Sequence, residues 1–164
     1  CSQELKRSNV QINMTIRIGQ RYTWFVFFLQ FRIMEKQTTF FSGLFIMLSI
    51  VFGAFGAHAL KEILEPAQLQ TFEVGVRYQG FLSMGVLLLA LNMDRFSFEI
   101  KRILWAMLIG MILFCFSIYG LVLGRHFIDP KAFGFLGPIT PIGGAISIIS
   151  WCLFLFRLLK YGQR

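Results

Sequence analysis

Long apolar runs separated by short polar segments dominate the pattern of this chain. Four runs stand out, at residues 40–60, 74–93, 103–123 and 139–156. The first carries no formal charge, and a helix of its length extends roughly 31 Å, close to the thickness of the hydrocarbon core of a bilayer. The runs are apolar at odd and even positions alike, which excludes the alternation of a membrane β-barrel. Because unpaired backbone groups are costly in hydrocarbon, the pattern predicts four transmembrane α-helices.

The segments between the runs are short and polar. Residues 61–73 carry Pro66 and predict a linker with a brief surface helix. Residues 94–102 are charged, and residues 124–138 mix glycine, proline and aromatic residues. The chain therefore predicts an all-α integral membrane protein, a four-helix transmembrane bundle over residues 34–160.

Residues 1–33 do not follow this pattern. Their strongest apolar stretch, at residues 22–31, is too short to cross a bilayer, since a transmembrane helix needs roughly 20 residues. The chain starts with Cys1, and Met14 and Met34 are both candidate start residues. We expect this part to be a poorly structured or non-native extension, with an interfacial segment or an uncleaved signal-like segment as alternatives.

The composition agrees with a membrane protein. Of the 164 residues, 56% are hydrophobic and only 15% are charged, whereas roughly a quarter of the residues are charged in soluble domains. The net charge of +8 comes from basic residues at the ends of the runs and not from a basic helix face. This distribution argues for a lipid bilayer as the partner and against nucleic acid.

Lysine and arginine residues are divided unevenly between the two sides of such a bundle. One side would carry twelve of them: Lys6, Arg7, Arg17, Arg21, Arg32, Lys36, Arg95, Lys101, Arg102, Arg157, Lys160 and Arg164. The other side would carry four, Lys61, Arg77, Arg125 and Lys131. Because basic loops stay in the cytoplasm, both termini are predicted to be cytoplasmic.

Small residues recur at four-residue spacing in two of the runs. They are Ser49, Gly53 and Ala57 in the first run, and Gly143, Gly144 and Ser147, with Thr140, in the fourth. Residues four apart lie on one face of a helix, and small residues let helices in lipid approach closely. We therefore expect these stripes to face other helices and not lipid.

Five polar residues fall near the predicted outer membrane face and form a candidate polar cluster: His58, Arg77, Tyr78, Gln79 and Thr140. Polar groups in membrane segments are costly and often functional. For His58, a proton relay or a metal ligand competes with a simple interfacial hydrogen bond. For Arg77, an anion site competes with snorkelling to headgroups or pairing with Glu73. The glycines after Thr140 suit either anion binding at a helix N-terminus or close helix approach.

Signatures of catalysis or cofactor binding are absent from the sequence. It contains no nucleophile elbow, P-loop, His-Glu-x-x-His pattern or dinucleotide fingerprint. Cys1, Cys115 and Cys152 form no Cys-x-x-Cys pair, and the last two lie in apolar runs. We therefore expect no enzyme activity, no cofactor and no bound metal. Tyr119 and Trp105, near span ends, are expected to be interfacial aromatics.

Four fragments occur together in a distinctive order: GAFGAHALK, FEVGVRYQ, FCFSIYGLVL and ITPIGG. They resemble the small membrane proteins grouped as domain of unknown function 423, which are related to animal transmembrane protein 256. The resemblance covers about residues 34–157. It implies a four-helix membrane protein, most often of the bacterial inner membrane, and no particular activity. Leu82 stands where the family commonly has a histidine, and Phe116 replaces a glycine, which implies a wider helix contact.

Two functions are consistent with these residues. The first is a structural or accessory plasma-membrane protein that forms a homo-oligomer or assembles with other membrane proteins, as the packing stripes suggest. The alternative is a transporter or channel for a small solute or ion that acts as an oligomer, as the polar cluster suggests. A water-filled cavity lined by that cluster would favour transport, and a packed interior would favour the accessory role.

Overall fold

Four long helices joined by short turns make up nearly all of the described chain. The computed structural model describes residues 36–128 and 133–162, so the extension expected over residues 1–33 lies outside the described residues. Apart from Lys36, the described residues belong to one unit, Gln37–Arg164.

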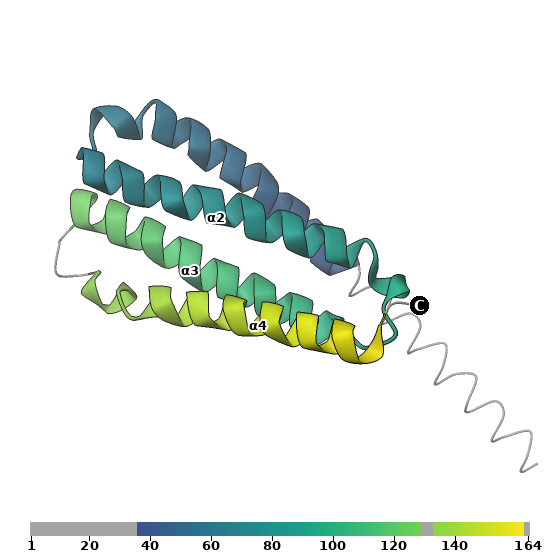
Figure 1. Cartoon of the computed structure of the whole chain (residues 1–164). Coiled ribbons are helices and arrows are strands. Elements are labelled where there is room, and N and C mark those ends of the chain that lie inside the picture. Colours follow the sequence, from purple (N-terminus) through teal and green to yellow (C-terminus); the bar gives the residue numbers. More distant parts are fainter. Residues whose placement is uncertain (1–35, 129–132, 163–164) are drawn as a thin grey trace, which may run out of the picture. The chain divides into compact units, whose positions relative to one another are not determined.

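The helices follow each other in a simple order. The first helix is described over residues 36–57. After it come the 3-10 helix η1 (Leu60–Glu62), α2 (Pro66–Ala90), η2 (Met93–Arg95), α3 (Lys101–Phe127), η3 (Gly134–Leu136) and α4 (Ile139–Tyr161). The four long helices lie side by side (Figure 1). The described residues contain no β-strand, so the all-α expectation is confirmed.

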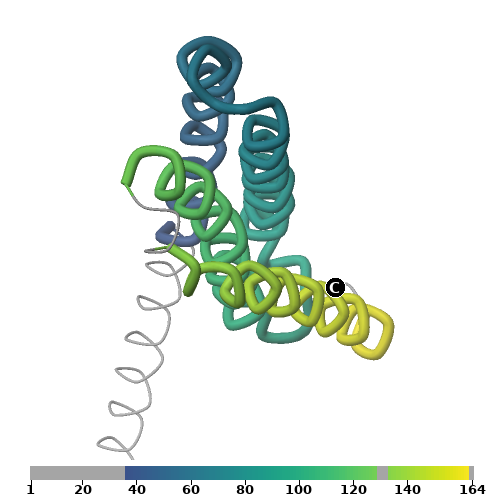
Figure 2. Tube along the Cα trace, turned by 90° about the vertical axis from the view of Figure 1, so that its left-hand side faces the viewer, coloured from purple at the N-terminus to yellow at the C-terminus, as the bar shows by residue number. Residues whose placement is uncertain are grey.

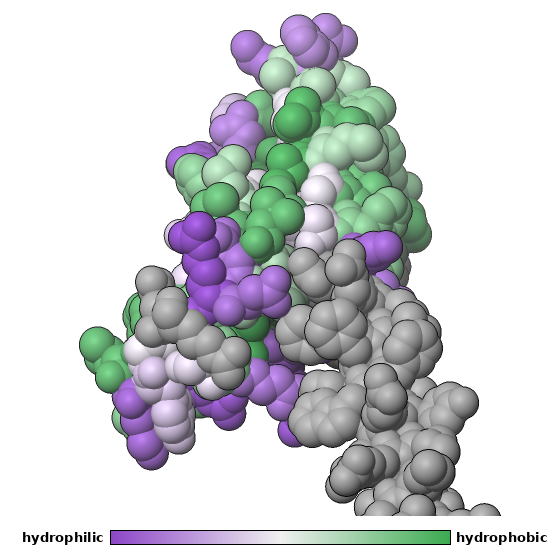
Figure 3. All heavy atoms as spheres, turned by 90° about the vertical axis from the view of Figure 1, so that its right-hand side faces the viewer, coloured by the Kyte–Doolittle hydropathy of each residue, from purple (hydrophilic) through white to green (hydrophobic). Residues whose placement is uncertain are grey.

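Three of these segments are long and apolar enough to cross a membrane: Lys36–Glu62, Lys101–Phe127 and Gly134–Tyr161. Large apolar side chains such as Ile50, Phe81 and Ile148 stay exposed on the outside of the helices. On the face seen in Figure 3, hydrophobic surface lies between hydrophilic patches. An exposed apolar surface of this extent is suited to lipid and not to water.

The second long helix begins earlier than expected. Pro66 occupies its first turn, where a missing N–H costs little, and Glu65 forms a capping box with Gln68. In that box the backbone N–H of Glu65 donates to Gln68 Oε1 at 3.2 Å. The brief surface helix expected within residues 61–73 is therefore wrong, because residues 66–73 form the first turns of α2.

Helix α3 is the centre of the bundle. It packs against α2 and α4, and its aromatic residues Trp105 and Tyr119 reach Phe41 and Phe52 of the first helix. Half of its most apolar stretch is buried inside the protein, against 17% for the first helix and 22% for α4. Figures 1 and 2 show α3 between α4 on one side and α2 with the first helix on the other.

Glycines bring α3 and α4 into backbone contact. A Cβ atom on Gly143 would overlap the backbone nitrogen of Phe114 and would lie 2.8 Å from the carbonyl oxygen of Gly110. A Cβ on Gly110 would lie 2.6 Å from Ser147 Oγ and 2.8 Å from Ser147 N. Because backbone atoms cannot move aside as a flexible side chain can, only glycine fits at these two positions.

We predict that Gly143→Ala destabilises the protein in detergent, because the added methyl group forces α3 and α4 apart. Overpacking of this kind lowers the free energy of unfolding by about 1–3 kcal/mol. The matched control is Gly43→Ala in the first helix, where an added Cβ meets nothing within 4 Å. Unfolding titrations in mixed micelles measure both variants, and equal stabilities would contradict the backbone contact.

Candidate functional site

Gln79 of α2 ties three helices together. Its side chain is fully buried. Nε2 donates a hydrogen bond to the carbonyl oxygen of Phe45 in the first helix at 2.9 Å, and Oε1 accepts one from the hydroxyl group of Tyr119 in α3 at 2.8 Å. We call this set, the Gln79 amide, the Tyr119 hydroxyl and the Phe45 carbonyl, the polar junction.

Aromatic rings enclose the polar junction. The ring of Tyr119 lies 5.1 Å from that of Phe52 and 5.0 Å from that of Phe72, centre to centre. Gly75 makes room for it, since a Cβ there would come within 2.7 Å of Tyr119 Cε1. Tyr119 is only 6% exposed, so its ring packs inside the bundle and not on its outer surface. Its hydroxyl group donates to Gln79, which gives the buried amide its partner.

The polar junction holds the three helices together through hydrogen bonds. Each end of the Gln79 amide already has a partner on another helix. A buried amide without such partners would be costly, and the hydrogen bonds instead fix the position of α2 between its neighbours. A second polar contact follows about one turn on, where Ser83 Oγ donates to Met111 Sδ at 3.0 Å.

The structure does not bring the candidate polar cluster together. His58, Arg77 and Tyr78 are exposed, whereas Gln79 points inward. Thr140 lies in α4 and shares a hydrogen bond of 2.7 Å with Ser117 of α3. No hydrogen bond or ion pair joins any two of these five described residues. The reason is helical geometry, because each residue is rotated by about 100° from the one before it.

The stripe in the first helix follows a different line from the expected one. Ser49 is buried and Gly53 faces Val76 of α2, but Ala57 is exposed. Gly56, one residue earlier, is buried against Phe72. A four-residue step rotates about 40° around a helix with 3.6 residues per turn, so the line drifts away from the neighbour by its third member. A seven-residue step, from Ser49 to Gly56, rotates only about 20° and stays in contact.

The stripe in α4 lies against α3. Gly143 and Ser147 are buried there, and Gly144 faces the ring of Phe114 at an ordinary distance of 3.5 Å from an added Cβ. Ser147 Oγ is buried and has no hydrogen-bond partner among the described residues. Its place in the contact with Gly110 is therefore determined by size and not by hydrogen bonding.

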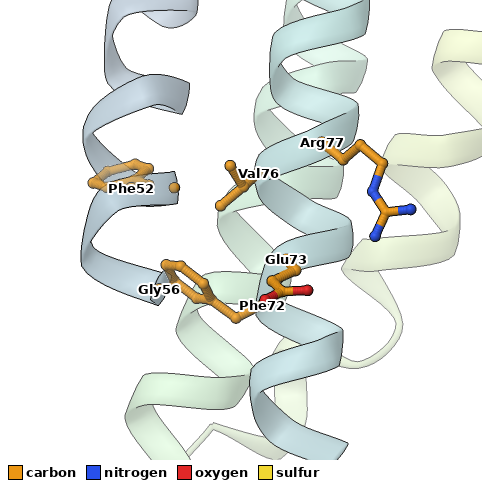
Figure 4. Close-up of a pocket in the computed structure, with 7 residues that line it drawn as sticks. Phe52, Gly56, Phe72, Glu73, Val76 and Arg77 are labelled. Carbon is orange, nitrogen blue, oxygen red and sulfur yellow. The ribbon is translucent and has the colours of Figure 1, made fainter. Parts of the chain in front are cut away.

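A shallow groove opens between the first helix and α2. Its volume is about 270 Å³, and Phe52, Gly53, Gly56, Phe72, Glu73, Val76 and Arg77 line it. Figure 4 shows the apolar side chains facing the space between the two helices, with Glu73 and Arg77 on the flank of α2. Arg77 and Glu73 form no ion pair, and the ion pair that the described residues do contain joins Arg102 and Glu99 at 3.9 Å.

Metal ligands do not gather in the described part of the chain. It contains no group of three or more histidine, cysteine, aspartate or glutamate residues able to hold an ion.

Phe116 stands where the resemblance described above implies a glycine. Its ring contacts the rings of Phe45 and Tyr119.

Sequence reasoning missed the inward face of α2, although the sequence contains a signal for it. Gly75, Gln79 and Ser83 follow each other at four-residue spacing, and all three are buried. The same rule that selected small residues in the first and fourth runs would have selected this line. It would have separated Gln79 from its exposed neighbours Arg77 and Tyr78.

We predict that Gln79 and Tyr119 stabilise the bundle jointly. Interhelical hydrogen bonds in membrane proteins average about 0.6 kcal/mol and reach roughly 1.7 kcal/mol. Gln79→Leu and Tyr119→Phe should each destabilise the protein, and the double variant should lose less than the sum because both remove the same bond. Tyr78→Phe, at an exposed position, is the control and should change little. Strict additivity in a double-mutant cycle would argue against the bond.

Comparison with known proteins places the chain in a family. The family described as "Protein of unknown function (DUF423)" matches residues 52–144. UPF0382 membrane protein YwdK of Bacillus subtilis is 32% identical over 70% of this chain and 89% of its own length. A UPF0382 membrane protein of Haemophilus influenzae is 36% identical over 68% of this chain and 84% of its own length. No solved structure matches the chain.

These matches agree with the sequence fragments and with the apolar helices. They cover most of the polar junction and the contact between α3 and α4, since residues 52–144 include Gln79, Tyr119 and Gly143. The protein is a membrane protein, and it belongs to the DUF423 family of UPF0382 membrane proteins.

Proposed function

We propose that this is a multi-pass protein of the bacterial inner membrane, that all four helices cross the bilayer, and that it acts as a structural or accessory component. Helix α2 has 25 residues, a length of roughly 37 Å, which exceeds the hydrocarbon thickness of about 30 Å. It carries more polar residues than its neighbours, but its buried amide is satisfied by two other helices. That satisfaction supports α2 as the fourth span.

The distribution of charge supports cytoplasmic termini. The turn between α2 and α3 lies beside the end of α4, because Ser97 Oγ donates to the carbonyl oxygen of Tyr161 and Arg157 donates to that of Glu99. This end gathers Arg95, Lys101, Arg102, Arg157 and Lys160. Basic residues next to spans favour the cytoplasmic side, which is the side proposed here for both termini.

The accessory role is supported by the way in which the buried polar groups are paired. A transport pathway needs polar groups that face water or a solute. In the described helices, Gln79, Ser83, Ser117 and Thr140 bond to neighbouring helices instead. The remaining candidates, His58, Arg77 and Tyr78, lie on the outside. Such an interior favours a packed scaffold that associates with other membrane proteins or with further copies of itself.

Cysteine labelling tests the arrangement of the spans. On a background without Cys1, Cys115 and Cys152, we predict that Glu62→Cys is labelled by an impermeant maleimide from outside the cell. Asp94→Cys should be labelled only after the membrane is opened, because α2 as a span places these two exposed residues on opposite sides. Labelling of both positions from the same side would contradict α2 as a span.

Crosslinking in native membranes tests the accessory role. We predict that the purified protein carries a reproducible membrane-protein partner or a second copy of itself, and that His58→Ala leaves this association unchanged. Recovery of the monomer alone would contradict the accessory role. Solute flux in proteoliposomes that His58→Ala abolishes would favour transport instead.

A further inference from the structure

Three cations lie together where the last turns of α4 meet the first turn of α3 (Figure 1). The guanidinium group of Arg157 in α4 donates a hydrogen bond to the carbonyl oxygen of Glu99 at 3.1 Å. Arg102, in the first turn of α3, reaches the carboxylate of the same Glu99 at 3.9 Å. Lys160 follows Arg157 by three residues and is therefore its neighbour on the surface of α4. We call Arg102, Arg157 and Lys160 the basic flank.

The described residues neutralise the basic flank only in part. Among them, Glu99 is the carboxylate that forms an ion pair with it, and 88% of the Arg102 side chain and 60% of the Glu99 side chain are exposed. An exposed pair of this kind contributes little, and its distance is longer than a hydrogen bond. Arg157 uses one N–H on a backbone carbonyl, which carries no formal charge. The flank therefore has an excess of positive charge and guanidinium donors to spare.

Both helices pass from a cation to exposed apolar surface within two turns. Ile109 follows Arg102 by seven residues in α3, and Leu153 precedes Lys160 by seven residues in α4. A seven-residue step rotates only about 20°, so each pair lies on one face of its helix, roughly 10 Å apart along the axis. Ile109 is 49% exposed and Leu153 is 41% exposed. Positive charge followed by apolar surface complements an anionic phospholipid, in which the phosphate is followed by the acyl chains.

We propose that the basic flank binds one anionic phospholipid. The guanidinium groups of Arg102 and Arg157 bind the phosphate, Lys160 adds a third positive charge, and the acyl chains lie against the exposed apolar faces of α3 and α4. Arginine suits the phosphate because its planar donors form charge-assisted hydrogen bonds. A soluble phosphate compound would match the charge of the flank but not the apolar surface beside it.

This inference rests on the proposal that α3 and α4 cross the bilayer, and it is independent of the accessory role and of the side on which the termini lie. A general attraction of basic helix ends to an anionic membrane requires charge alone. A bound lipid also requires guanidinium groups at this place in the fold. The experiment separates these two cases.

The experiment is native mass spectrometry of the full chain, stripped of lipid in mild detergent and given phosphatidylglycerol or phosphatidylcholine in equal amounts. The wild type should bind phosphatidylglycerol about tenfold more tightly, because the choline group offsets the phosphate charge. Arg102→Gln and Arg157→Gln should each weaken phosphatidylglycerol binding about fivefold, the effect of one basic residue beside an anionic lipid. Arg125→Gln, an exposed arginine at the other end of α3, is the matched control and should bind as the wild type does.

Two further variants distinguish a bound lipid from general attraction. Arg102→Lys keeps the charge but loses the planar donors, and it should weaken phosphatidylglycerol binding roughly threefold. Glu99→Gln removes the carboxylate that competes for Arg102, and it should strengthen this binding roughly threefold. Soluble glycerophosphoglycerol at the same concentration should not displace the lipid, because it has no acyl chains.

The proposal is overturned if the wild type has no preference between the two lipids, if Arg102→Gln binds like Arg125→Gln, or if Arg102→Lys binds like the wild type. Displacement of the lipid by the soluble headgroup would overturn it as well. Because Arg102 is exposed, its variants decide the question even if Arg157→Gln does not fold. Cysteine labelling that confirms the spans, together with no lipid preference, would refute this inference alone and leave the proposed spans in place.

Discussion

A buried amide must find its hydrogen-bond partners within the protein, because a packed interior offers no water. Gln79 finds them on two helices at once, in the carbonyl group of Phe45 and the hydroxyl group of Tyr119. A single bond of this kind contributes only about 0.6 kcal/mol on average. Its larger effect is on register, since a shift of α2 by one turn would remove both partners and leave the amide unpaired. The alignment of the first helix, α2 and α3 therefore depends on one side chain.

The contact between α3 and α4 rests on shape instead. Gly110 and Gly143 allow the two backbones to meet, and Ser147 fits between them without a hydrogen bond. Helix α3 takes part in both kinds of contact, which explains why it is the most buried of the three segments that are long and apolar enough to cross a membrane. The first helix packs less tightly against α2, and the groove lies between them. The first helix and α2 thus share both a buried hydrogen bond and an open groove, whereas α3 and α4 meet backbone to backbone.

The helices themselves could be predicted from the sequence, because an uninterrupted apolar run has few alternatives in lipid. The small residues Gly143 and Ser147 could also be predicted, since glycine in such a run has little other use. The directions in which the side chains of Arg77 and Gln79 point were harder to predict. Neighbouring residues on a helix lie at a similar height along its axis but on different faces. The partner of Gln79 could not be found locally, since Tyr119 is forty residues away and near the end of a run. Position near a span end suggested an interfacial tyrosine, and only the packing of Phe52 and Phe72 around it places it inside.

The central claim is that α2 belongs to a dry bundle held by the polar junction. Hydrogen–deuterium exchange of the protein in lipid nanodiscs tests it most directly, because slow exchange requires both intact helical hydrogen bonds and the exclusion of water. Residues 74–84 of α2 should exchange as slowly as residues 104–115 of α3. Rapid exchange in that part of α2, next to slow exchange in α3, would contradict the account.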